Sequence, residues 1–79
     1  MEIKIIIGHR IKQLREKIGM SQKDLAFESD LDRSYIASVE NGQRNISIVN
    51  ITKIAAALKV SLKVFFNDDE FNDNPTSSK

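Results

Sequence analysis

Cysteine is absent from this 79-residue chain, and histidine occurs only once, as His9. Without cysteine there is no disulfide, no zinc-thiolate site and no thiol nucleophile, and one histidine leaves almost nothing from which to build a histidine-based metal site or catalytic triad. Asp30 with Asp32 and the acidic run 68–70 lack the spacing and the glycine pattern of a calcium loop. We therefore expect no catalytic residue, no metal and no cofactor, and the protein is predicted not to be an enzyme.

Long apolar runs are also missing. The stretch from Ile3 to Ile7 is interrupted by Lys4 and is too short for a membrane span or for the apolar region of a signal peptide. We therefore expect no membrane association and a cytoplasmic protein, which the lack of cysteine also fits. With three Gly, one Pro, 41% hydrophobic and 29% charged residues, the composition is that of a globular protein, and 79 residues are enough for one domain only.

Charge is unevenly distributed along the chain, although the formal net charge is only +1. Residues 67–79 hold four acidic residues and one lysine, a local charge of −3, which leaves +4 on residues 1–66. A mildly basic body is compatible with a polyanionic partner but does not require one. Because the C-terminal segment is polar and acidic, we predict a folded domain over residues 1–66 and a disordered tail over residues 67–79.

Apolar side chains at helical spacing predict an all-α fold. One apolar stripe consists of Ile7, Ile11, Leu14 and Ile18, and Gly19 follows it as a helix-ending residue. Four more short helices are predicted to begin at side chains that can cap a first turn, namely Ser21, Asp32, Ser47 and Ser61. The helix after Ser47 carries a core face of Ile48, Ile51, Ile54, Ala55 and Leu58. The expected fold is thus a compact set of five helices without a strand.

Residues 21–45 contain the sequence pattern that indicates the function. Two short helices are joined here by about three residues, a spacing that forbids antiparallel packing of the pair. Ala26 is small enough to let the helices cross closely, while Leu25, Leu31, Ile36 and Val39 fill the angle between them. This is the geometry of a helix-turn-helix motif, whose second helix projects from the surface and enters the major groove of DNA.

The same segment resembles the lambda repressor and Cro family of DNA-binding domains, also called the Xre type, and the likeness extends over residues 7–66. The matching residues are Ser21-Gln22, Leu25-Ala26, Leu31, Ile36, Val39 and Glu40-Asn41-Gly42. Asp30 departs from the pattern, since it stands at the turn position where the family often has glycine. We expect it in left-handed backbone space, which Asp tolerates better than most side chains. The resemblance implies a sequence-specific regulator of bacterial or phage origin that binds double-stranded DNA of the nucleoid.

Three residues are implied as base contacts by this resemblance, namely Arg33, Ser34 and Ser38 on the outward face of the second helix of the motif. A guanidinium at the start of that helix can donate two hydrogen bonds to guanine O6 and N7, which distinguishes guanine from other bases by about 1 to 3 kcal/mol. The alternative is that Arg33 pairs with Asp30 or Asp32 on the protein surface.

Contacts to the DNA backbone are implied for Gln22, Tyr35, Arg44 and Asn45. Gln22 opens a helix whose free N–H groups favour phosphate, but it can also be an ordinary exposed glutamine. Tyr35 can instead be a partly buried structural residue. In the family, the glutamate that matches Glu40 pairs with an arginine of the first helix, so the resemblance implies a structural ion pair between Arg15 and Glu40.

A single short recognition helix covers only a few base pairs, so we expect a homodimer on two half-sites roughly 34 Å apart in a palindromic operator. Because the chain is short, the dimer surface is predicted to lie within residues 1–66, with Leu62, Val64 and Phe65 as candidates. Phe65 and Phe66 can equally fill the core of their own domain.

Residues 31–47, LDRSYIASVENGQRNIS, make the chain most similar to the controller proteins of bacterial restriction-modification systems. These small homodimeric regulators bind operators upstream of their own gene and time endonuclease expression, activating at low and repressing at high concentration, which implies RNA polymerase as a further partner. A stand-alone phage or mobile-element repressor and an antitoxin-type regulator share the motif. A further alternative, from a different functional class, is a protein interaction module that keeps the fold without binding DNA.

Overall fold

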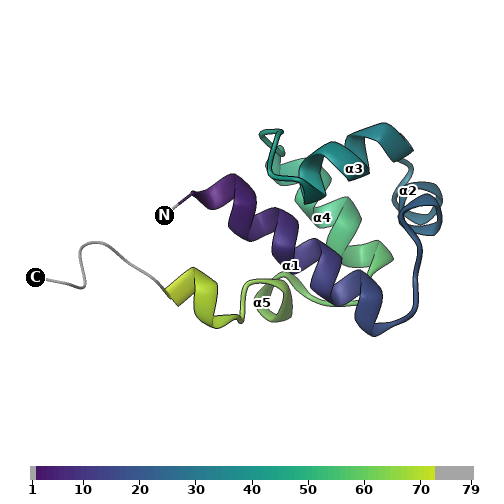
Figure 1. Ribbon diagram of the computed structural model, residues 1–79. Helices are drawn as coiled ribbons and strands as arrows, with labels where there is room; N and C mark the ends of the chain where they lie inside the picture. The colour runs from purple at the N-terminus through teal and green to yellow at the C-terminus, as the bar shows by residue number, and fades with distance from the viewer. Residues whose placement is uncertain (1, 73–79) are drawn as a thin grey trace, which may run out of the picture.

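The computed structural model describes residues 2–72, which form five α-helices and one short 3₁₀ turn (Figure 1). The helices are α1 (Ile3–Lys17), α2 (Gln22–Ser29), α3 (Arg33–Glu40), α4 (Ile48–Ala57) and α5 (Leu62–Phe65), and the turn is η1 (Asp69–Asn72). Figure 1 shows α2 and α3 on one side of α1, with α5 and η1 on the other. This part of the chain contains no strand, and the predicted all-α fold with five helices is confirmed.

Most helices begin where the sequence supplies an acceptor for a free N–H group. The four predicted caps, Ser21, Asp32, Ser47 and Ser61, all accept a hydrogen bond from a backbone N–H of the first turn. Ser21 and Asp24 form a reciprocal pair, because Ser21 Oγ accepts from Asp24 N at 3.0 Å and Asp24 Oδ2 accepts from Ser21 N at 3.4 Å. One such cap stabilises a helix by about 1 kcal/mol, so these ends are fixed locally by the sequence.

The first helix begins at Ile3, one turn before the apolar stripe that starts at Ile7. Glu2 is the cap residue, and its side chain accepts from the backbone N–H of Lys4 at 3.2 Å. Ile6 is buried in this added turn, at 8% exposure. The run of isoleucines hides the helical period of residues 3–7, because side chains on both the buried and the exposed faces are apolar.

Two residues that the spacing predicted in the core are exposed. Ile18 is 50% exposed because it lies one residue beyond the last helical residue of α1, so the buried stripe of that helix ends at Leu14. Ile48 is the first residue of α4 and is 79% exposed, so the buried stripe of that helix begins at Ile51. Both predictions were wrong, and both residues stand at the end of a helix.

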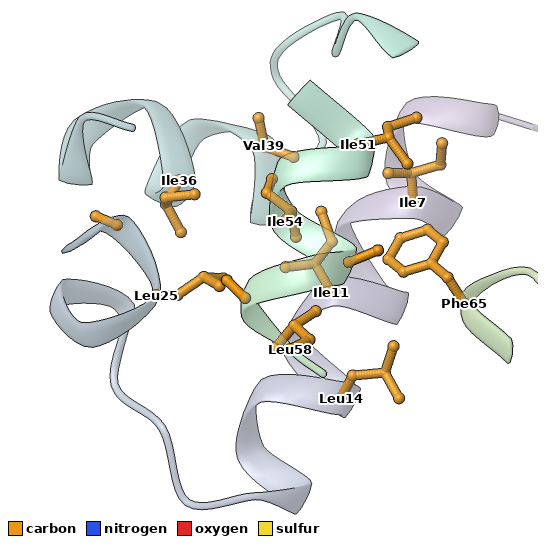
Figure 2. Packing of buried hydrophobic residues seen from close by; sticks show 13 residues of the cluster. Ile7, Ile11, Leu14, Leu25, Ile36, Val39, Ile51, Ile54, Leu58 and Phe65 are labelled. Carbon is orange, nitrogen blue, oxygen red and sulfur yellow. The ribbon is translucent and has the colours of Figure 1, made fainter. Parts of the chain in front are cut away.

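One hydrophobic core joins α1, α4, α5 and the helix-turn-helix segment. Figure 2 shows Ile7 and Ile11 of α1 facing Ile51 and Ile54 of α4, with the ring of Phe65 beside them. Ile11, Ile54 and Phe65 are fully buried at 0% exposure. Complete burial of a side chain of this size contributes about 1.5–3 kcal/mol, so this cluster is the main favourable contribution to folding.

The turn between α2 and α3 has the backbone geometry that the motif needs. Asp30 adopts the left-handed conformation, with φ 58° and ψ 41°, as predicted. This allows the N–H of Leu31 to bond to the carbonyl of Ala26 at 3.0 Å and turns the chain towards α3. Ala26 is only 5% exposed, since the two helices cross over it.

A close approach between α1 and the end of α3 depends on Gly8. A Cβ atom at this position would lie 2.7 Å from the backbone carbonyl oxygen of Glu40 and against that of Val39. No side chain fits there without moving the two helices apart. Gly8 therefore sets how closely α3 sits on α1, and so fixes where the outward face of α3 points.

Arg10 of α1 holds the C-terminal end of α5. Its Nε donates to the carbonyl of Phe65 and its Nη2 to that of Val64, each at 2.7 Å, and its Nη1 lies 3.7 Å from Asp68 Oδ1. These carbonyls lie at the end of a four-residue helix, where the regular pattern of helical hydrogen bonds stops. A buried guanidinium thus stabilises a helix too short to be stable by itself.

Residues 67–72 lie on the body of the protein, beyond the predicted domain boundary at residue 66. Phe71 packs edge-on against Phe66, with ring centroids 5.0 Å apart, and is partly buried against the core. The prediction of a disordered tail from residue 67 onward missed this contact, because the acidic composition outweighed the single aromatic residue. The remainder of the predicted tail, residues 73–79, lies outside the described residues.

Candidate DNA interface

The outward face of α3 presents the three residues predicted to contact bases. Arg33 and Ser34 are exposed at the start of the helix, and Ser38 is half-buried one turn further on. A shallow groove of about 410 Å³ lies beside the first two and is lined by Gln22, Arg33, Ser34 and Ala37. The structure thus brings the start of α2 and the start of α3 together around one surface depression.

Arg33 has no ion-pair partner among residues 2–72. The alternative in which it pairs with Asp30 or Asp32 is therefore not found. Asp32 instead uses its carboxylate to cap α3, accepting from Ser34 N at 3.2 Å. The guanidinium is left on the surface with its five N–H donors available to an external acceptor.

Gln22 is half-buried and held in place by Glu40. Its Nε2 donates to Glu40 Oε1 at 3.0 Å, so it is not the ordinary exposed glutamine of the alternative interpretation. Because its amide nitrogen is bound to Glu40, Gln22 lines the groove beside Arg33 in a fixed orientation. A polar side chain with a fixed orientation loses less conformational entropy when it binds a ligand than a free one does.

Arg15 and Glu40 form the ion pair implied by the resemblance. Arg15 Nε donates to Glu40 Oε2 at 2.7 Å and Arg15 Nη2 to Glu40 Oε1 at 3.0 Å, while Nη1 donates to the carbonyl of Met20 at 2.8 Å. The side chain of Glu40 is only 2% exposed. The hydrogen bond to Glu40 raises the pKa of Arg15, against a smaller opposing effect of burial. The pair links α1 to α3 and, through Gln22, to α2.

Tyr35 is half-buried and makes two contacts outside α3. Its hydroxyl accepts a hydrogen bond from Asn50 Nδ2 of α4 at 3.0 Å. The guanidinium of Arg44, in the loop after α3, lies over the ring with Cζ 5.0 Å from the centroid. Asn45 follows Arg44 in the same loop and is exposed. Asn50 was not singled out from the sequence, because a polar residue in the first turn of a helix carries no distinguishing pattern.

The predicted dimer candidates divide into exposed and buried residues. Leu62 and Val64 are 42% and 45% exposed, but Phe65 is 0% exposed and cannot contact a partner, so its assignment to the dimer surface was wrong. Phe65 fills the space between α1 and α4 and belongs to the core (Figure 2). Ile48 and Val49, at 79% and 62% exposure, are further apolar residues on the surface.

Residues 2–72 contain no group of three or more His, Cys, Asp or Glu side chains placed to hold a metal ion. Within the same range, none of the helices has the length and apolar character that crossing a bilayer requires. The fold, the exposed face of α3 and the polar residues around its start together define the class of helix-turn-helix DNA-binding domains.

Comparison with known proteins places the chain within this class. Residues 11–65 match the family model described as helix-turn-helix. The chain is 49% identical over 70 residues to the control protein C.MunI of Mycoplasma sp, a match that covers 87% of this chain and 95% of that protein. The chain belongs to this family of DNA-binding transcription regulators and, within it, to the control proteins of restriction-modification systems.

Solved structures give the same result. The restriction-modification controller protein C.AhdI from Aeromonas hydrophila superposes with a TM-score of 0.79 at 47% identity, covering 84% of this chain and 100% of that one. The controller protein C.Esp1396I, solved as a tetramer in complex with its natural 35 base-pair operator, superposes with a TM-score of 0.80 at 39% identity, covering 84% of this chain and 87% of that one.

Proposed function

We propose that the protein binds double-stranded operator DNA as a homodimer and regulates transcription in a restriction-modification system, including that of its own gene. The observation that carries this function is the outward face of α3, where Arg33 is exposed beside a groove and has no carboxylate partner in residues 2–72. The solved operator complex of C.Esp1396I, to which the chain is 39% identical, supports operator DNA as the ligand.

The roles of individual residues follow from their positions. Arg33, Ser34 and Ser38 contact base edges in the major groove, since they lie along the face that α3 presents to the outside. Contacts to the sugar-phosphate backbone come from Gln22 at the start of α2, Tyr35 in α3, and Arg44 and Asn45 in the loop that follows. The backbone contacts position the domain, and the base contacts select the sequence.

A second copy of the chain supplies the other half of the interface. One α3 helix reaches only a few base pairs, so two copies with recognition helices roughly 34 Å apart are needed for useful specificity. Leu62 and Val64 on α5 remain the proposed dimer contacts, and their exposure leaves them available for one. On this proposal RNA polymerase is a further partner at the promoter, the protein acts in the cytoplasm at the nucleoid, and it catalyses no reaction.

A selection experiment tests the function. The purified protein is incubated with a pool of random duplex DNA, and the bound sequences are amplified and read after several rounds. The expected result is two inverted half-sites whose centres lie about 10 base pairs apart, as two-fold symmetry requires. Enrichment of a single half-site would contradict the homodimer, and enrichment of no sequence would contradict operator binding.

A second candidate is a stand-alone phage or mobile-element repressor. It is favoured by 30% identity over 63 residues to the immunity repressor protein of Bacillus phage phi105, although the match covers only 44% of that protein. The genes beside the coding sequence distinguish the two functions, because a controller protein is expected next to an endonuclease gene and a methyltransferase gene.

A further inference from the structure

Asn50 bonds to the hydroxyl of Tyr35 and so joins α4 to the recognition helix. Its Nδ2 donates to Tyr35 Oη at 3.0 Å. Both side chains are half-buried, so the bond is partly shielded from water. Asn50 is itself fixed in the first turn of α4, where its backbone N–H donates to the capping Ser47 Oγ at 3.1 Å. The amide therefore holds the end of the tyrosine ring from a rigid position.

The direction of this hydrogen bond determines what the hydroxyl can do next. A phenol has one O–H donor, and its oxygen also accepts. Because the oxygen of Tyr35 accepts from Asn50, its own proton points away from that amide. Within residues 2–72, the Tyr35 hydroxyl takes part in this one side-chain hydrogen bond, and as its acceptor. The hydroxyl is thus left as a hydrogen-bond donor on the surface that faces DNA in the proposed function.

The surroundings of this hydroxyl favour an anionic acceptor. The guanidinium of Arg44 lies over the Tyr35 ring, 5.0 Å from its centroid, and Arg44 has no ion-pair partner in the described residues. The first turn of α4 is also close, since Asn50 belongs to it, and the positive end of the helix dipole attracts negative charge. A phosphate oxygen is an anionic acceptor, so it matches both the free donor and the positive charge around it.

We infer that Asn50 is a positioning residue of the DNA interface, which holds the Tyr35 hydroxyl as a donor directed at a phosphate of the DNA backbone. The inference rests on the proposed function, because DNA is the source of that phosphate. A bond from a neutral donor to an ionised acceptor is roughly twice as strong as one between neutral groups. Asn50 makes this bond available without any rearrangement of the hydroxyl on binding.

A double-mutant cycle with Asn50→Asp and Tyr35→Phe tests this role. Asn50→Asp keeps the size of the side chain but replaces the donor with an acceptor, which takes the hydroxyl proton away from the phosphate. The aspartate also adds a negative charge that repels DNA in both backgrounds, so this effect cancels when the backgrounds are compared. An aspartate in the first turn of a helix is compatible with folding of α4.

Affinity is measured by fluorescence anisotropy on a duplex obtained from the random-pool selection. Tyr35→Phe is expected to weaken binding about tenfold, by loss of one hydrogen bond to a charged group, and to keep Arg44 over the ring. Asn50→Asp is expected to weaken binding in both proteins. The loss of affinity should be about five times larger in the protein that keeps Tyr35 than in the Tyr35→Phe protein. Asn50→Ala should weaken binding only in the protein that keeps Tyr35.

Asn72→Asp is the matched control, because it adds the same charge in the exposed η1 turn, on the other side of α1 from α3 (Figure 1). It should leave affinity within about twofold of the parent protein. Equal losses for Asn50→Asp in both backgrounds would overturn the positioning role while leaving operator binding intact. Failure of the parent protein to bind any selected duplex would instead overturn the proposed function, and this inference with it.

Discussion

Removal of the Glu40 carboxylate is predicted to destabilise the fold severely. Glu40 is 5% exposed and accepts two hydrogen bonds from Arg15, at 2.7 and 3.0 Å, and one from Gln22 at 3.0 Å. Glu40→Ala leaves the Arg15 guanidinium, itself 8% exposed, without a counter-charge in the protein interior. Breaking a buried ion pair from one side costs about 3–5 kcal/mol. A domain of this length has a total stability of only about 4–12 kcal/mol.

Urea denaturation followed by far-ultraviolet circular dichroism measures this loss. The midpoint should fall with an unchanged slope, which assigns the change to the folded state. Glu16→Ala is the control, because Glu16 is an exposed acidic residue next to Arg15 in the sequence, and it should change stability by less than about 0.5 kcal/mol. Replacing both partners, as Arg15→Met with Glu40→Leu, should restore much of the stability, since no unpaired charge is then buried.

The pH dependence of the same measurement follows from the pKa of Arg15. The hydrogen bond to Glu40 raises this pKa. A folded-state pKa above the unfolded value stabilises the protein at every pH below the unfolded pKa, and the effect is lost only as the pH rises through the folded-state pKa. The loss of stability caused by Arg15→Met should therefore stay constant from about pH 6 to about pH 9.

A loss of stability below about 1 kcal/mol for Glu40→Ala would contradict a buried structural ion pair between Arg15 and Glu40.

Three further predictions concern the packing of α3, the loop after it and α5. Gly8→Ala should lower the free energy of unfolding by about 1–3 kcal/mol in urea, because the added Cβ meets the Glu40 carbonyl oxygen, and an unchanged midpoint would contradict this close approach. Arg44→Ala should reduce the slope of log K against log salt by about one unit in anisotropy titrations, and an equal slope would exclude a phosphate contact. Leu62→Ser should weaken self-association in sedimentation with little loss of stability, whereas Phe65→Ala should cost about 3–5 kcal/mol of stability; the opposite pattern would refute their assignment to surface and core.

Local signals in the sequence predicted the helix-turn-helix segment well. The caps Ser21 and Asp32 and the turn at Asp30 act within a few residues of their own position, so their roles follow from residue type and spacing. The outward face of α3 follows in the same way, because the apolar residues Ile36 and Val39 fix which side of a short helix is buried.

Contacts between distant parts of the chain were missed. Arg10 lies outside the apolar stripe of α1, and no local pattern shows that it binds carbonyls 54 and 55 residues away. Gly8 lies within a helix, and only the position of α3 shows why a side chain is excluded there. The role of Asn50 depends on the place of one tyrosine hydroxyl. Spacing along the sequence describes one helix at a time, and these three residues act between helices.

Base recognition by α3 is tested most directly by the specificity ratio of Arg33→Ala. The ratio is the affinity for the selected duplex divided by the affinity for a scrambled duplex of the same length and salt concentration. Arg33→Ala should lose about 1–3 kcal/mol on the selected duplex and little on the scrambled one, and Arg33→Lys, which keeps the charge, should lose specificity as well. Equal losses on both duplexes would contradict base recognition by Arg33 and reduce its role to electrostatic attraction.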